Sequence, residues 1–122
     1  MTPDIDVIKE TLWLKARAVE GYDPDIFRKD ACGAWIRKDM FGQPDNMFGW
    51  GVDLIFPKVL GGTPVESNLR ALNCRNLASK GNDYPSYNAV LIADGNRNVS
   101  TDIYVTINSK LRQILKTIYE NA

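Results

Sequence analysis

The stretch from residue 50 to residue 80 limits the possible folds more than any other part of this sequence. Three elements are predicted there: a strand over 50–56, a returning strand over 68–72 and a short helix over 73–80. Pro57 ends the first strand, and the pair Gly61-Gly62 marks a tight turn between the two strands. Two antiparallel strands followed directly by a helix predict an α+β fold.

The flanking sequence adds two helices and a second strand pair to this unit. Helical spacing predicts a helix over 3–18, with Thr2 as its N-cap and Pro3 as its first residue. A C-terminal amphipathic helix is predicted from five apolar residues on one face, Ile107, Leu111, Ile114, Leu115 and Ile118. Smaller elements are a helical turn over 23–28, a strand over 32–37, and a hairpin of strands over 88–93 and 99–106. We expect one domain over residues 1–122.

Composition excludes several kinds of chemistry. The chain has no histidine, so it supplies no imidazole as a general base or as a metal ligand. Its 15 basic and 15 acidic residues cancel, which excludes nucleic-acid binding by bulk charge alone but leaves room for a local basic face.

The N-terminus and the cysteines indicate the cellular setting. Residues 1–6 are acidic and lack an apolar run, so they do not resemble a secretory signal, and no stretch approaches a membrane-spanning length. Two cysteines, Cys32 and Cys74, are too few for a disulfide scaffold. We expect a cytoplasmic protein that does not bind membranes.

Residues 50–81 carry a family resemblance. They read Trp-Gly-Val-Asp-Leu-Ile-Phe-Pro over 50–57, then Gly61-Gly62, then Glu-Ser-Asn-Leu-Arg over 66–70, and finally Ser-Lys-Gly over 79–81. This is similar to the HNH endonuclease family, whose ββα-metal core is a strand–loop–strand–helix unit that holds one divalent metal. The flanks, Cys-Gly-Ala-Trp-Ile over 32–36 and Tyr-Pro-Ser-Tyr over 84–87, are similar to small bacterial members of this group.

The resemblance implies a role for four positions. Asp53 matches the metal-binding aspartate, and Leu54 stands where the family has the histidine that deprotonates the attacking water. Asn68 matches the asparagine that orients this histidine, and Leu77 stands at the second metal ligand. Asn76, next to Leu77, points about 100° away on a helix and is not expected to replace it.

These replacements lead to two functional hypotheses. A general base contributes on the order of 10²–10⁴ in rate, and leucine has no proton-accepting atom. The first hypothesis is therefore a degenerate HNH-fold protein, without a cofactor, that binds DNA or a protein partner and does not cleave. The alternative is a metal-dependent endonuclease with a displaced site, in which Asp53 binds one divalent ion such as Mg²⁺.

Other readings of the same residues remain open. Asp53 can instead pair with a cation in an apolar strand, Asn68 can bond the backbone of its loop, and Leu54 can touch Leu77 as apolar core. Four cations form either a DNA-facing patch or a solvated surface: Lys58, Arg70, Arg75 and Lys80. Three aromatic residues suit core packing better than base stacking: Trp35, Trp50 and Tyr84. The number of chains in an assembly is left open.

Overall fold

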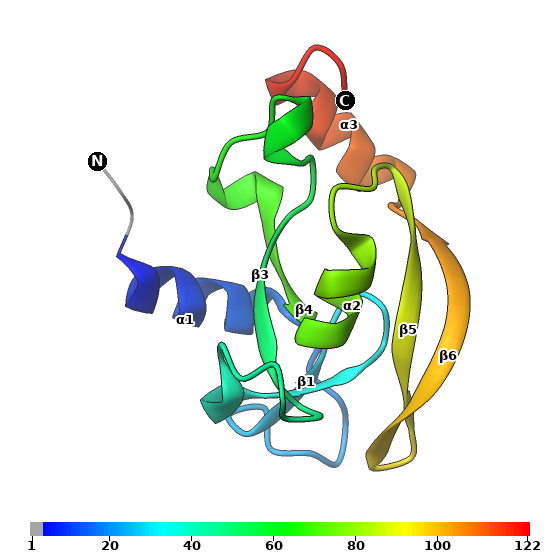
Figure 1. Ribbon diagram of the computed structural model, residues 1–122. Coiled ribbons are helices and arrows are strands. Elements are labelled where there is room, and N and C mark those ends of the chain that lie inside the picture. Colours follow the sequence, from blue (N-terminus) through cyan, green and yellow to red (C-terminus); the bar gives the residue numbers. More distant parts are fainter. Residues whose placement is uncertain (1–3) are drawn as a thin grey trace.

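The computed structural model describes residues 4–122 and confirms the predicted α+β class. Within these residues, three α-helices accompany three antiparallel sheets of two strands each (Figure 1). In chain order the elements are α1 (Ile5–Lys15), β1 (Phe27–Lys29), β2 (Trp35–Arg37), β3 (Trp50–Leu54), β4 (Leu69–Asn73), α2 (Cys74–Lys80), β5 (Ser86–Asp94), β6 (Arg97–Thr106) and α3 (Ser109–Ile118). The sheets pair β1 with β2, β3 with β4, and β5 with β6.

The β3–β4 hairpin and helix α2 follow one another in the predicted order strand, strand, helix. Trp50 pairs with Asn73 at one end of the hairpin, and Leu54 pairs with Leu69 at the other. Asn73 then caps α2, because its side chain accepts a hydrogen bond from the Arg75 backbone. Helix α1 lies beside the hairpin on one side, and α2 lies between the hairpin and β5 (Figure 1).

Two apolar clusters fill the interior. The cluster on the α1 side of the hairpin is formed by Leu12, Trp13, Ile36, Trp50, Leu69 and Ala71. The cluster towards α3 is formed by Ile55, Phe56, Tyr87, Ile107, Leu115, Tyr119 and Ala122. Trp35 and Trp50 are buried, and Tyr84 packs its ring against Phe56, so all three predicted aromatics serve as packing residues.

The N-terminal elements differ from their prediction. Asp4 is the N-cap of α1, while the predicted cap Thr2 and first residue Pro3 lie outside the described residues. The helix ends at Lys15 rather than at residue 18, because Arg17 forms a two-bond backbone bridge with Lys29. The predicted helical turn over 23–28 is wrong in its second half, where Phe27 begins β1.

Helix α3 buries only part of its apolar face. Leu115 is fully buried, but Ile114 and Ile118 keep 41% and 43% of their surface exposed. Asn108 caps this helix, because its side chain accepts a hydrogen bond from the Leu111 backbone. Among residues 4–122, no helix combines the length and the apolar character needed to cross a membrane.

Candidate functional site

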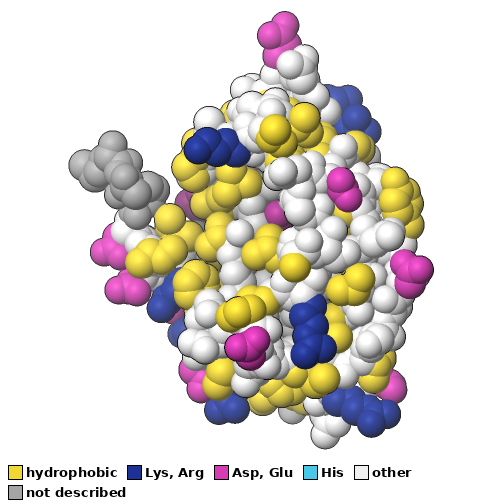
Figure 2. Space-filling view, viewed as in Figure 1, with side chains coloured by type: hydrophobic (Ala, Val, Ile, Leu, Met, Phe, Trp, Pro, Cys, Tyr) yellow, Lys and Arg dark blue, Asp and Glu magenta, His cyan; other side chains and the backbone are white. Residues whose placement is uncertain are grey.

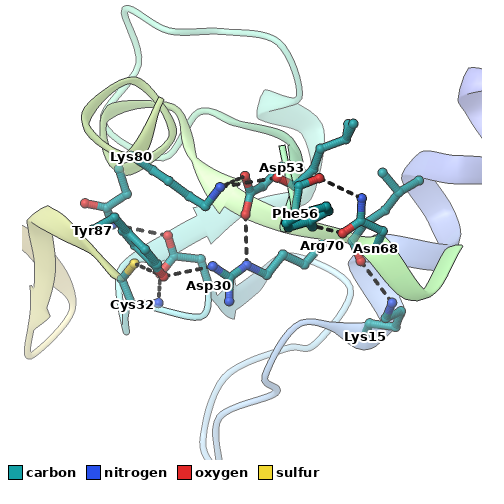
Figure 3. Close-up of polar contacts among 12 residues, drawn as sticks. Lys15, Asp30, Cys32, Asp53, Phe56, Asn68, Arg70, Lys80 and Tyr87 are labelled. Carbon is teal, nitrogen blue, oxygen red and sulfur yellow. Dashed lines mark hydrogen bonds and ion pairs between the residues drawn. The ribbon is translucent and has the colours of Figure 1, made fainter. Parts of the chain in front are cut away.

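Asp53 lies at the centre of a buried polar cluster (Figure 3). It sits on β3 directly opposite Arg70 on β4, and its side chain is 2% exposed. Arg70 Nε lies 3.0 Å from Asp53 Oδ2, and Lys80 Nζ lies 3.1 Å from Oδ1. Each carboxylate oxygen therefore faces a cation of the chain itself, which confirms the interpretation of Asp53 as an ion-paired aspartate.

Lys80 reaches this cluster from the last turn of α2. Its side chain is 1% exposed, and its ammonium also donates a hydrogen bond to the Leu54 carbonyl at 3.2 Å. The same nitrogen lies 5.9 Å from the centre of the Tyr87 ring. A buried lysine is tolerated only with such compensation, since an unpaired charge inside a protein is strongly destabilising.

Tyr87 and Cys32 close the cluster on the side of β5. The Tyr87 hydroxyl accepts a hydrogen bond from Arg70 Nη2 at 2.9 Å and lies 3.5 Å from Cys32 Sγ. Burial raises the pKa of the Cys32 thiol to about 11 and raises the pKa of Tyr87 above its ordinary value. Cys32 is thus a protonated thiol near neutral pH, which makes it a poor nucleophile.

Leu54 and Leu77 do not meet, so the predicted contact between them is wrong. Successive residues of a strand point to opposite faces, and Leu54 packs against the cluster on the α1 side. Leu77 lies over Gly51 on the other face, where a Cβ on that glycine would come within 3.2 Å of Leu77 Cδ2. The four family positions therefore do not converge on one cavity.

Asn68 braces the loop between the two strands. Its Oδ1 accepts from the Phe56 backbone at 2.7 Å, while its Nδ2 donates to the carbonyls of Phe56 and Thr63. The interpretation of Asn68 as a loop-bonding residue is confirmed. Turn geometry also accounts for Gly62, since a Cβ there would lie 1.7 Å from the Phe56 carbonyl oxygen.

Asn76 is committed to a second buried network. Its Nδ2 donates to Asp30 Oδ2 and to the Leu91 carbonyl, and its Oδ1 accepts from the backbone at Val90 and Leu91. Because all these bonds are made inside the fold, the Asn76 side chain is not available as a second metal ligand beside Asp53.

The four predicted DNA-contacting cations do not form one surface. Arg70 and Lys80 point inward to Asp53, whereas Lys58 and Arg75 are exposed. These two lie at opposite ends of the hairpin, because Lys58 follows β3 while Arg75 lies in the first turn of α2, whose first residue Cys74 bonds the Gly49 carbonyl. On the face that carries α2, basic side chains lie apart from one another (Figure 2). The prediction of a single patch is corrected accordingly.

The residues at this site do not fit the divalent ion that the resemblance implies. Such an ion needs several oxygen ligands, whereas both oxygens of Asp53 are ion-paired and Leu54 and Leu77 offer none. Across residues 4–122, no three side chains among His, Cys, Asp and Glu gather as a potential metal site.

Sequence reasoning missed Tyr87, Cys32 and Asp30 as members of these buried networks. Each contacts residues far away in the chain, as when Asp30 Oδ2 accepts from the Asn73 backbone at 2.8 Å. No local pattern signals such contacts.

No protein-family model, curated protein or solved structure matches this chain.

Proposed function

We propose that this chain is a catalytically degenerate relative of the HNH endonucleases that binds DNA or a protein partner in the cytoplasm without cleaving phosphodiester bonds. The order of β3, β4 and α2 supports this proposal, as does the bracing of the intervening loop by Asn68. An intact unit with an altered centre is typical of a scaffold reused for binding.

The pairing of Asp53 with Arg70 and Lys80 is the observation that supports the proposal most strongly. Hydrolysis of a phosphodiester needs an activated water and a charge to stabilise the leaving oxygen. Here the carboxylate that matches the metal ligand is neutralised from both sides by buried contacts of 3.0 and 3.1 Å. This pairing leaves the centre without the free carboxylate that a divalent ion would need.

A plasmid-nicking assay tests the loss of cleavage. Purified protein is incubated with supercoiled DNA and with Mg²⁺, Mn²⁺, Ni²⁺ or Zn²⁺ in turn, beside an Asp53→Ala variant checked for folding by circular dichroism. We expect no metal-dependent nicking by either protein. Nicking by the wild type that the variant lacks would favour the alternative, a metal-dependent endonuclease that uses Asp53.

A binding assay separates the two partner classes. Polarisation of a labelled DNA duplex is measured over a salt series, because binding to phosphates weakens steeply as salt rises. Salt-sensitive binding supports a DNA partner. Absence of binding even at low salt leaves a protein partner.

A further inference from the structure

A groove beside β4 gathers several basic side chains at its lining. It has a volume of about 360 Å³ and lies where the end of α1, the end of β1, the middle of β4 and the start of α3 meet. Four cations line it, namely Lys15, Arg17, Lys29 and Arg70. The one acidic residue of the lining is Asp30.

The backbone holds two of these cations next to each other. The Arg17 N–H donates to the Lys29 carbonyl at 3.0 Å, and the Lys29 N–H donates to the Arg17 carbonyl at 2.9 Å. Residues paired in this way carry their side chains on the same face. Lys29 is steadied further, because its ammonium lies 4.9 Å from the centre of the Trp35 ring.

Three of the four cations at this groove have no salt-bridge partner among the described residues, and only Arg70 has one. Within residues 4–122, Lys15, Arg17 and Lys29 form no salt bridge. Asp30 brings one negative charge to the lining but forms no salt bridge with these cations, because its two oxygens accept four hydrogen bonds from inside the fold. Cations held together without an acidic partner attract anions from solution.

Arg70 and Lys15 are held in place at the groove by other contacts. Arg70 is fixed by Asp53 and Tyr87, which use two of its five N–H donors. The Lys15 ammonium donates to the carbonyls of Glu66 and Leu69, which leaves one of its three N–H groups free. Each of the two side chains thus keeps N–H groups that these bonds do not use.

The shape of the groove favours an elongated ligand. A neighbouring hollow of about 560 Å³ shares Lys15 and Leu111 with it and is lined further by Glu66, Ser67 and Ile114. The basic part is lined otherwise by small residues, among them Ala16, Ala31 and Ala71. Its lining contains no aromatic anchor of the kind that dominates protein–protein interfaces.

We infer that this groove binds the sugar–phosphate backbone of DNA, with Arg17 and Lys29 contacting phosphate oxygens and Lys15 and Arg70 at its edges. The inference rests on the DNA branch of the proposed function and assigns that binding to a groove that borders the hairpin–helix unit only at Arg70 and Ala71 of β4. Guanidinium and ammonium groups are the usual donors to phosphate oxygens. Since the formal net charge is zero, binding depends on this local group of cations.

The test compares two double variants that remove the same charge. Arg17→Gln with Lys29→Gln alters the groove, while Lys58→Gln with Arg75→Gln alters the exposed cations of the hairpin–helix unit. Polarisation of a short labelled DNA duplex is measured from about 50 to 200 mM salt. We expect the groove variant to bind about tenfold more weakly at low salt, and its salt slope to fall by about 0.9 for each phosphate no longer neutralised. The control variant should stay within about twofold of the wild type.

Three outcomes would overturn the inference, and each has a different consequence for the proposed function. Loss of binding in the Lys58/Arg75 variant alone moves the DNA site to the hairpin–helix unit and leaves the proposed function intact. Absence of DNA binding by the wild type at low salt removes the DNA branch altogether and leaves a protein partner. Equal competition by polyglutamate and by unlabelled DNA at matched charge shows a surface for any polyanion, including an acidic protein.

Discussion

The chain contains two groups of basic side chains, and Arg70 belongs to both. In the buried cluster, Arg70 and Lys80 face Asp53 from two sides at 3.0 and 3.1 Å. In the groove, Arg17 and Lys29 lie paired through their backbones with no acidic side chain in salt-bridge range among residues 4–122. One group neutralises charge inside the fold, and the other leaves it available outside.

The difference shows that burial decides whether a cation affects the stability of the fold or is available for binding. Charges removed from water are tolerated only when paired, so breaking such a pair is far more costly than removing an exposed charge. Lys80 is 1% exposed, whereas Arg17 lies on the surface. Substitutions in the buried cluster should therefore change stability, and substitutions in the groove should change binding.

The largest effect is expected from Asp53→Asn. Removal of the anion leaves Arg70 and Lys80 facing each other in a buried site, so the free energy of unfolding should fall by about 3–5 kcal/mol. Urea unfolding followed by circular dichroism measures this change. Asp102→Asn, at an exposed position of β6, is the matched control and should stay within about 0.5 kcal/mol of the wild type.

A second variant keeps this prediction testable if Asp53→Asn does not fold. Asp53→Leu combined with Lys80→Met replaces the buried Asp53–Lys80 pair with apolar side chains of similar size, so only the partly exposed Arg70 loses its partner, whereas Asp53→Asn leaves two cations unpaired. We expect it to be more stable than Asp53→Asn. A loss below about 1 kcal/mol in the single variant contradicts the ion-paired cluster.

The next effect is expected from Asn68→Ala, which removes three hydrogen bonds to the loop between β3 and β4. The backbone groups of Phe56 and Thr63 are left without their side-chain partner, so the free energy of unfolding should fall by about 2–3 kcal/mol. The matched control is Asn88→Ala on β5, whose side chain is exposed. Equal urea midpoints for the two variants would show that Asn68 does not brace the loop.

The hairpin–helix unit could be predicted because its signals are local. Residues 50–56 are mostly apolar, with Asp53 as the one charged residue, Pro57 ends the strand, and the Gly61-Gly62 turn needs its glycines. Even the separation of Leu54 from the Asp53 face follows from the two-residue period of a strand, so this signal was present in the sequence. The predicted contact between Leu54 and Leu77 was wrong because it followed the family positions and ignored this period.

The remaining contacts join residues that are far apart in the sequence, and no local sequence pattern indicates such contacts. Tyr87 meets Arg70 across 17 residues, and Cys32 meets Tyr87 across 55. β1 has three residues, Phe27–Lys29, which is too short to display an alternating pattern. The groove escaped prediction for the same reason, because it joins segments around residues 15, 29, 70 and 108.

A smaller effect is expected from pH, through Cys32. Its pKa rises from 9.0 to about 11 on folding, first through burial and then through the charge of Asp30. The folded protein thus holds this proton more tightly than the unfolded chain. The resulting stability is fully present below pH 9.0 and is lost as pH rises towards about 11. Urea midpoints across this range should fall less in Cys32→Ala than in the wild type, and parallel curves would contradict the assignment.

The smallest effect on stability is expected from Arg17→Gln combined with Lys29→Gln in the groove. Neither side chain forms a salt bridge among residues 4–122, and the backbone bridge between the two residues does not depend on their side chains. The double substitution does remove the interaction of the Lys29 ammonium with the Trp35 ring, which is worth about 0.5–1 kcal/mol. Urea unfolding of this variant should therefore stay within about 1 kcal/mol of the wild type. A larger decrease would mean that these cations hold the fold together, and the contrast with the Asp53 cluster would disappear.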